Sequence, residues 1–538
     1  MTQDIKYITE TKKLIDNLKN VCANFGLGND GNEFKIITQA FLYKFLNDKF
    51  SYAAKQEMPE LEQAENFSEA LQQLEKDKYQ MLLWSLGPNI PHLQPEHLLS
   101  YLYNQQNNDD FAKLFDDTLR QISLDNADVF SVKSASGAKD KLFDELSQFI
   151  SDSSQRDDFC RALINKLVDF SFEEMFDQKY DFFATIFEYL IKDYNSDSGG
   201  KYAEYYTPHA VARVMAKILV PEPVKKVSCY DPSAGSGTLL MSLAHEIGED
   251  NCTIYSEDIS QKSSNMLRLN LVLNNLTHSI PNVIKTNTLA QPYYLDRKFD
   301  YIVSNPPFKL DFSDFHSELQ KEAFKQRFFA GIPKIPNKKK ESMAIYLLFI
   351  QHIMYQLSDH GKAAIVVPTG FITAQSGIEK KIRERLIDNG WLRGVVSMPS
   401  NIFANTGTNV SVLFLDKDAD NEHVVLVDAS KLGHTVKEGN RERTVLTPEE
   451  ENLIVETFYN KQPKEDFAVV VSTEEIKAKN YSFSAGQYFE VKIEYVDITP
   501  EEFAAKMQGF QERLQALFAE GQNLDNKIQK QLKGLKYE

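Results

Sequence analysis

The sequence predicts an α/β protein in which an open, mainly parallel sheet covered by helices follows an all-helical N-terminal domain and precedes a C-terminal helix. Three observations predict this fold class. Apolar residues recur at helical spacing over roughly the first 190 residues, short β-rich runs alternate with helical stretches in the middle of the chain, and helical spacing returns near its end. We therefore expect a helical domain over 1–192, a sheet domain over 193–480 and a helical segment over 481–538.

The composition is typical of a globular protein. Hydrophobic residues make up 42% and charged residues 25% of the 538 residues, which are too many for a single core. No apolar run approaches the roughly 20 residues that span a bilayer, and the polar N-terminus is unlike a signal peptide. The four cysteines form no CxxC pair. We expect a cytoplasmic protein with no membrane contact and no metal site.

The net charge of −17 limits the nucleic-acid partners that the chain can hold by itself. Duplex binding depends mainly on Lys and Arg contacts to phosphates, so this charge argues against a protein that coats nucleic acid. It does not exclude an enzyme that acts on DNA. In such an enzyme the contact would be confined to a local basic patch or supplied by a partner.

Helical spacing defines the N-terminal domain. Apolar residues recur three and four positions apart in 34–50, 111–122 and 159–172, where glycine and proline are sparse. The polar, glycine-containing segment 193–200 predicts a loop at the domain boundary.

Six apolar runs are the predicted strands of the sheet. Helical patterns separate the first several, as in successive βαβ units, so these strands should be parallel. Only ten residues separate the last two runs, too few for a crossover helix, and we expect them to form an antiparallel hairpin at the sheet edge. The runs are 226–231, 251–258, 299–305, 361–368, 392–399 and 410–416.

The C-terminal segment opens with a strong helix start. Thr499 is a suitable N-cap, Pro500 suits the first helical position, and two acids follow. Apolar residues then alternate by four and three, which predicts either a coiled-coil-like seam or a helix that packs on the chain's own core. The seam comprises Phe503, Met507, Phe510, Leu514, Leu517, Leu524, Ile528 and Leu535.

A loop of small residues follows the first predicted strand. Asp231 ends the strand, and 232–238 leads into a helix, so the backbone can turn sharply and approach a ligand at the C-terminal edge of the sheet. The loop lacks the third glycine of GxGxxG and is not a P-loop. Its acid suits a cationic or hydroxyl-bearing ligand better than a phosphate. The alternative is an ordinary turn between a strand and a helix.

Two acids, Glu257 and Asp258, end the next predicted strand. Folds of this kind bind ribose hydroxyls with an acid at that position. For Asp258 taken singly, a helix cap is the alternative.

Asn305-Pro306-Pro307-Phe308 follows the third predicted strand. The two prolines fix the backbone and remove two donors, so Asn305 and the Pro306 carbonyl can be held toward one point while Phe308 stacks on a planar ring. An exocyclic amine on a base requires acceptors and a ring face of this kind. The alternative is an unstructured turn with no catalytic or binding role.

These motifs resemble those of the gamma group of amino-methyltransferases, and the whole layout resembles the modification subunits of Type I restriction-modification systems. Residues 231–237 are similar to the cofactor motif, 305–308 to the catalytic motif of adenine-N6 enzymes, and Tyr205-Tyr206-Thr207-Pro208 to the N-terminal cofactor motif. The resemblance covers roughly 200–420 through motifs and the two ends by layout only. Further family elements are Glu379, Met398-Pro399, Asn401-Ile402-Phe403 and Asn405-Thr406-Gly407.

The resemblance implies a Rossmann-like, S-adenosyl-L-methionine-dependent, site-specific DNA adenine-N6 methyltransferase. Such an enzyme flips its target adenine out of the duplex, and its catalytic residues here would be Asn305, Pro306, Pro307 and Phe308. Asn287 stands where relatives often carry an acid for the cofactor's adenine amine, and its carbonyl can still accept a hydrogen bond. The implied cofactor residues are Glu204, Tyr205, Tyr206, Thr207, Pro208, His209, Asp231, Gly235, Ser236, Gly237, Thr238, Asp258 and Asn287.

A basic segment over 321–340 follows the catalytic motif. It carries seven Lys or Arg against one acid, hence a net charge of +6. Its position favours contact with DNA phosphates, above all through Lys334, Lys338, Lys339 and Lys340, while a solvated loop is the alternative. The seven cations are Lys321, Lys325, Arg327, Lys334, Lys338, Lys339 and Lys340.

Recognition of the DNA sequence is expected to be delegated to a partner. Only about 120 residues follow the last predicted strand, which leaves no evident recognition domain. The resemblance implies a separate specificity subunit on double-stranded DNA, two copies of this chain beside it, and a restriction subunit. The helix over 501–535 suits docking on such a partner. The alternatives are a self-sufficient DNA methyltransferase, an N-methyltransferase for RNA or protein glutamine, and an inactive scaffold.

Overall fold

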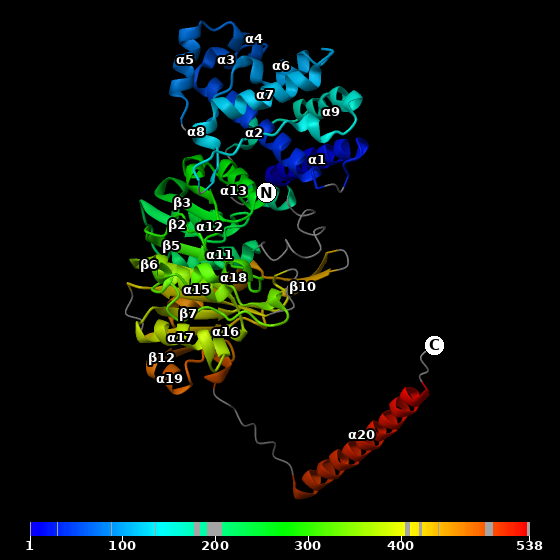
Figure 1. The fold of residues 1–538 in the computed structure, drawn as a ribbon, viewed down its shortest axis with the longest axis vertical. Coiled ribbons are helices and arrows are strands. Elements are labelled where there is room, and N and C mark those ends of the chain that lie inside the picture. The colour runs from blue at the N-terminus through cyan, green and yellow to red at the C-terminus, as the bar shows by residue number, and fades with distance from the viewer. Residues whose placement is uncertain are drawn as a thin grey trace. The chain divides into compact units, whose positions relative to one another are not determined.

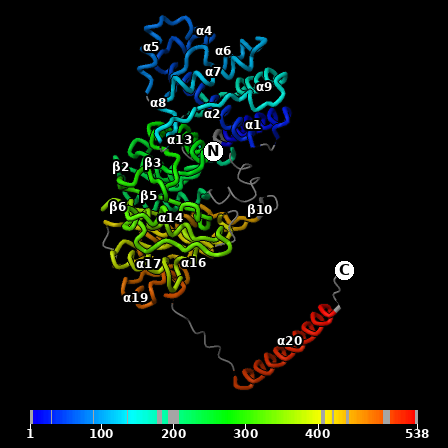
Figure 2. Tube along the Cα trace, viewed as in Figure 1, coloured from blue at the N-terminus to red at the C-terminus, as the bar shows by residue number. Residues whose placement is uncertain are grey.

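The computed structural model comprises two compact units, Met1–Tyr488 and Phe489–Glu538, drawn as a ribbon in Figure 1 and as a tube in Figure 2. No helix of the described residues is both long and apolar enough to cross a membrane. The domain boundary expected near residue 192 lies outside the described residues. These are 2–28, 31–87, 89–134, 136–176, 183–190, 207–403, 409–418, 422–438, 441–489 and 499–534.

Helices build the N-terminal part of the first unit. α2 (Glu33–Glu57) lies at its centre, and apolar residues occur on every face of this helix, so all its residues from 40 to 51 are buried. The other helices pack around α2 and α9. They are α1 (Thr2–Asn24), α3 (Pro59–Glu62), α4 (Phe67–Gln72), α5 (Lys76–Ser85), α6 (Leu99–Asn104), α7 (Phe111–Asp125), α8 (Ala127–Phe130), α9 (Arg156–Val168) and a helical stretch over 183–190.

A ten-stranded sheet follows, and it confirms the predicted fold class. Its strand order is β1-β4-β3-β2-β5-β6-β8-β7-β9-β12. Neighbouring strands from β1 to β6 are parallel, while β8 runs antiparallel to both β6 and β7. The strands are β1 (Lys133–Ser134), β2 (Val227–Asp231), β3 (Cys252–Asp258), β4 (Val283–Lys285), β5 (Phe299–Ser304), β6 (Leu357–Pro368), β7 (Leu392–Ser397), β8 (Val410–Asp416), β9 (His423–Asp428) and β12 (Ala468–Ser472).

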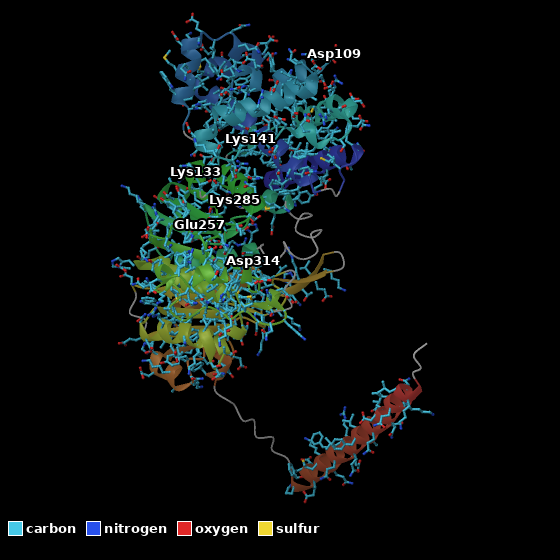
Figure 3. The ribbon with its side chains drawn as sticks, in the orientation of Figure 1. Asp109, Lys133, Lys141, Glu257, Lys285 and Asp314 are labelled. Carbon is cyan, nitrogen blue, oxygen red and sulfur yellow. The ribbon has the colours of Figure 1, made fainter. Side chains whose placement is uncertain are left out.

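The predicted hairpin of β7 and β8 is present, but its expected place at the sheet edge is wrong. β9 pairs parallel with β7, and β12 pairs antiparallel with β9, so the hairpin lies inside the sheet. The opposite edge also differs from the prediction. There β1, from the otherwise helical N-terminal region, pairs with β4 and places Ser134 opposite Lys285; Lys133 and Lys285 are labelled in Figure 3.

Helices pack against the sheet and against one another. A bidentate ion pair joins α11 (His209–Leu219) to α18 (Pro448–Asn460). In this pair Arg213 donates to both carboxylate oxygens of Glu451, at 2.9 and 2.6 Å. A separate two-stranded sheet consists of β10 (His434–Glu438) and β11 (Arg441–Val445). The helices are α11 (His209–Leu219), α12 (Thr238–Ile247), α13 (Gln261–Leu273), α14 (His316–Leu319), α15 (Tyr346–Gln356), α16 (Gly370–Thr373), α17 (Gly377–Asp388), α18 (Pro448–Asn460) and α19 (Thr473–Ala478).

The sheet grows in opposite directions from β2. After β2 the chain adds β3 and β4 on one side, then crosses to add β5 and β6 on the other. The carboxyl ends of β2, β3 and β5 therefore lie side by side, since Asp231 pairs with Ser256 and Tyr230 with Ile302. Ligands of open α/β sheets bind at such a reversal.

The second unit, described by itself, contains one long helix, α20 (Pro500–Gly534). The predicted helix start is present, because Glu502 N donates to Thr499 Oγ1 at 3.2 Å and Thr499 N donates to the Glu502 carboxylate at 3.0 Å. The apolar side chains of the predicted seam are exposed from Phe503 to Ile528. Leu535 lies outside the described residues.

Candidate active site

Three loops meet where the sheet reverses: 232–237 after β2, 286–291 after β4, and 305–308 after β5. Ser233 Oγ lies 2.8 Å from Ser304 Oγ, which joins the first loop to the end of β5. Thr288 Oγ1 donates to the Pro232 carbonyl at 2.7 Å, which joins the first loop to the second. The structure thus gathers at one edge the motifs that the sequence spreads over about 75 residues.

The glycine loop is shaped by close packing on α13. Gly235 and Gly237 have φ of 53° and 83°, a region that favours glycine. A Cβ on Gly237 would lie 2.2 Å from Leu267 Cδ1, so a larger residue there would force the buried Leu267 side chain to move. Asn270 of α13 donates to the Ser236 carbonyl at 3.2 Å, and Ser236 Oγ lies 3.2 Å from Thr238 Oγ1 at the start of α12. The loop is therefore a fixed, close-packed turn.

Asp231 lies at the centre of this edge and is 1% exposed. Its Oδ1 accepts a hydrogen bond from Ser233 N at 2.9 Å. Burial raises the pKa of Asp231 to about 7, and the neighbouring Asp258 acts in the same direction. A cationic ligand group would favour the ionised carboxylate.

The two acids at the end of β3 have different surroundings, because successive side chains of a strand point to opposite faces. The Asp258 carboxylate faces the glycine loop and accepts from Gly235 N at 3.0 Å and from Ser260 N at 2.8 Å. Burial raises its pKa. The helix-cap alternative for Asp258 is wrong, since the N-cap of α13 is Ser260.

Glu257 is fully buried in the core, at the position labelled in Figure 3. It accepts from the Tyr230 hydroxyl and from Tyr293 N, the latter at 2.6 Å. Burial raises the pKa of Glu257 to about 7. Of the two acids, Asp258 is therefore the one placed to meet a ligand.

The Asn305 side chain is oriented by a residue of another predicted motif. Its Nδ2 donates to Thr207 Oγ1 at 3.2 Å, and both residues are buried. Pro306 and Pro307 are buried after β5, and Phe308 is half-buried with its ring centroid 6.2 Å from that of Tyr346. With Nδ2 engaged, the amide presents Oδ1 as its acceptor.

Other predicted cofactor residues lie around this edge or outside the described residues. Pro208 is the N-cap of α11 and His209 its first residue, with His209 Nε2 4.0 Å from a carboxylate oxygen of Glu188. Asn287 Oδ1 accepts from two backbone donors, Leu289 N and Ala290 N, at 3.1 Å each. Its carbonyl thus already holds the 286–291 loop, and the expected contact with an adenine amine stays a prediction. Glu204, Tyr205 and Tyr206 fall outside the described residues.

Among the seven cations of the basic segment, Arg327 is buried and does not have the exposed position that contact with DNA requires. Arg327 is 1% exposed and donates to the carbonyls of Thr288, at 3.3 Å, and Leu289. The rings of Phe324 and Phe328 lie 4.2 and 4.3 Å from its guanidinium carbon. Arg327 therefore cannot contact DNA; it anchors the basic segment to the 286–291 loop. Lys334, Lys338, Lys339 and Lys340 are exposed.

The anchoring role of Arg327 was not predicted from the sequence, although the sequence contains a signal for it. Phe324 and Phe328 stand three positions before and one after Arg327, so a compact turn can place both rings on the guanidinium.

No group of three or more potential metal ligands occurs among the residues that the structure describes.

Comparison with known families gives one match over more than half of the chain. A sequence model of the family described as N-6 DNA Methylase matches residues 178–495. The match thus covers the sheet domain and every loop of the candidate site.

Two curated relatives and one solved structure are similar to the chain. The Type I restriction enzyme MpnII methylase subunit of Mycoplasma pneumoniae is 28% identical over 63% of this chain and 63% of that protein, so the chain matches slightly less than two thirds of it. The MjaIX methylase subunit of Methanocaldococcus jannaschii is 28% identical over 74% of this chain and 70% of the relative. A type I restriction-modification system methyltransferase subunit from Streptococcus thermophilus has the same fold, with a TM-score of 0.70 at 22% identity over 90% of this chain and 100% of that one.

We expect Arg327→Lys to lower the midpoint of thermal unfolding, because a lysine cannot donate to both carbonyls from one plane or stack on both rings. Loss of a hydrogen bond from a charged group in this buried position should cost about 1.5–3 kcal/mol. The matched control is Lys325→Gln in the same segment, since Lys325 is exposed and pairs with the exposed Glu322. Equal midpoints for the two variants, measured by circular dichroism, would contradict the anchoring role of Arg327.

Proposed function

The chain belongs to the N-6 DNA methylase family, and on that premise we propose that it is the modification subunit of a type I restriction-modification system. Its reaction would be the transfer of a methyl group from S-adenosyl-L-methionine to N6 of a flipped adenine at a specific DNA site, in the cytoplasm. One observation carries the proposal: the reversal of the sheet at β2 brings the acid-containing glycine loop and Asn305-Pro306-Pro307-Phe308 to one edge.

The loop after β2 fits the proposed cofactor in shape and charge. Gly235 would keep the backbone free of a side chain where a nucleoside must approach closely, while Gly237 lets the loop pack tightly on Leu267 of α13. Asp231 would bind the cationic amino-acid tail and Asp258 the ribose hydroxyls. Thr207, close to Asn305, would lie between the cofactor and the target base. When bound, S-adenosyl-L-methionine supplies a methyl group already activated on a sulfonium.

The residues after β5 fit an extruded adenine. Asn305 Oδ1 and the Pro306 carbonyl would accept hydrogen bonds from the N6 amine, which orients its lone pair toward the methyl group. Phe308 would stack on the base, supported by Tyr346. Because the methyl group is activated before it reaches the site, the residues contribute mainly through position and orientation.

The remaining partners follow from charge and from the second unit. The exposed Lys334, Lys338, Lys339 and Lys340 would contact DNA phosphates beside the target base. The segment 481–538, with the exposed seam of α20, would dock on helices of a specificity subunit that reads the DNA sequence. A second copy of this chain and a restriction subunit would complete the assembly.

Asn305→Ala should reduce methyl transfer by about 100-fold or more, because a hydrogen bond made at the reacting atom is lost, while cofactor affinity stays within about twofold. Transfer of tritium from labelled cofactor to plasmid DNA, with the specificity subunit present, measures the first, and calorimetry the second. Phe308→Ala should behave likewise, and Phe308→Tyr should retain most activity because it keeps the ring. If the product is N4-methylcytosine, methylated RNA or methylated glutamine, the proposed substrate is wrong.

Cofactor affinity should rise with pH up to about 7.5 and then level off. The pKa of Asp231 is raised from 3.8 to about 7 in the free protein, and a cationic ligand stabilises the carboxylate, so binding below neutral pH must release a proton. Calorimetry at pH 6.5 in two buffers of different ionisation enthalpy measures this release. Asp231→Asn should abolish it. Glu257→Gln is the matched control, because Glu257 has a similarly raised pKa but lies in the core; loss of proton release in that variant instead would contradict the assignment.

Disruption of the α20 seam should separate the complex without affecting the cofactor site. Phe510→Glu with Leu514→Glu places two charges on the seam, and Gln511→Glu with Gln515→Glu places the same two charges beside it. We expect co-purification with the specificity subunit to be lost only in the first pair and in a chain lacking 500–538, with cofactor affinity unchanged in all three. Sequence-specific methylation by the chain alone would contradict delegated recognition.

A further inference from the structure

A cavity of about 330 Å³ lies where the N-terminal helices meet the end of α13, apart from the candidate active site. One face of α2 forms a wall through Phe45, Lys49 and Tyr52. Phe176 and Phe183 form a second wall, and Asn275 follows the end of α13. This volume is at the small end of the range for sites that bind small molecules.

The walls of the cavity are mainly aromatic, and the rings support one another. The ring centroid of Phe45 lies 5.5 Å from that of Phe176 and 6.0 Å from that of Phe183, both in edge-on geometry. The Tyr52 ring lies 5.3 Å from Phe176. Such a fixed set of rings presents faces and edges to a flat ligand.

Lys49 is the cation of this cavity, and its pairing differs from that of the other lysines nearby on α2. Lys44 pairs with Asp48 at 2.9 Å, and Lys55 pairs with Glu173 at 2.8 Å. Lys49 is 7% exposed, yet its Nζ donates to a neutral amide oxygen, Asn275 Oδ1, at 2.5 Å. Within the described part of the chain no carboxylate forms a salt bridge with it.

A buried ammonium group without a carboxylate is costly. Burial lowers the pKa of Lys49 to about 8, because removal from water disfavours the charged ammonium form. The Phe45 ring, 5.6 Å from Nζ, and the amide of Asn275 offset part of it. Among the described lining residues the other charged one, Glu57, is exposed and stands eight residues further along α2, a rise of about 12 Å along the helix axis. An anion in the cavity would complete the charge balance that the described residues leave open.

We propose that this cavity is a binding site for a small aromatic anion, with Lys49 holding the negative group and the rings of Phe45, Tyr52, Phe176 and Phe183 enclosing the planar part. The cavity is separate from the candidate active site, where methyl transfer is proposed to occur. Its floor is nevertheless the end of α13, whose Leu267 limits Gly237 and whose first residues follow Asp258. A ligand there would join the N-terminal helices to the helix that supports the cofactor loop.

The test uses the fluorescent aromatic sulfonate 8-anilinonaphthalene-1-sulfonate and the full-length chain, with S-adenosyl-L-methionine in excess to occupy the candidate active site. We expect saturable binding to one site. Lys49→Met keeps the length of the side chain and removes its charge, so the affinity should fall roughly tenfold or more. Ala53→Phe leaves Lys49 in place but fills the cavity that Ala53 lines, so binding at this site should be lost. Lys55→Met, the matched control on the same helix, should bind like the unmodified chain.

Two further measurements separate the proposal from simple hydrophobic adsorption and from DNA binding. The uncharged analogue N-phenyl-1-naphthylamine should bind the unmodified chain and Lys49→Met equally well. A duplex oligonucleotide in excess should not displace the sulfonate, since the cavity is too small for a duplex. The proposal is overturned if the unmodified chain shows no saturable binding, if Ala53→Phe binds normally, if Lys49→Met and Lys55→Met have equal affinity, or if the duplex displaces the probe.

Discussion

The position of β2 between β3 and β5 is the constraint on which the candidate site depends. Because the chain builds the sheet outward from β2 in both directions, the loops after β2 and β5 leave the same edge of the sheet side by side. The 2.8 Å contact between Ser233 and Ser304 then fixes the distance between the two loops. Two loops far apart in the sequence thus become two sides of one candidate site, and under the proposed function one would bind the cofactor and the other the target base.

A polar layer in the core holds the residues just behind this edge. The Tyr230 ring stacks on Phe299 at 4.2 Å, and its hydroxyl donates to Glu257 and lies 3.2 Å from His352 Nε2. Tyr230 directly precedes Asp231, and Glu257 directly precedes Asp258. Strand alternation therefore assigns one residue of each pair to the core and the next to the side of the glycine loop. Burial keeps the pKa of His352 well below its usual value, so this ring is neutral and adds no charge beside Arg327.

The sequence predicted those features that depend on local pattern. The glycine loop, the strand before it and Asn305-Pro306-Pro307-Phe308 each lie within a few residues, and the alternation of strands and helices determines that their ends share an edge. Features that depend on distant partners were missed. The burial of Arg327 requires two carbonyls almost forty residues earlier, and the position of the β7–β8 hairpin inside the sheet requires β9 and β12 to pair beyond it. The different surroundings of Glu257 and Asp258 could have been predicted from strand alternation alone.

The distribution of charge explains why a flipped base suits this site under the proposed function. Asp231 is buried at the sheet edge beside Asp258, and a bound cofactor cation would keep the Asp231 carboxylate ionised, so an approaching phosphate would meet negative charge in a poorly solvated place. A DNA backbone must then stay outside, where the exposed lysines of 334–340 are. An adenine ring carries no charge and can enter. Extrusion of the base would thus bring the reacting amine near the acids that are proposed to hold the cofactor. The phosphates would remain with the exposed lysines. This separation is consistent with a chain whose net charge is −17.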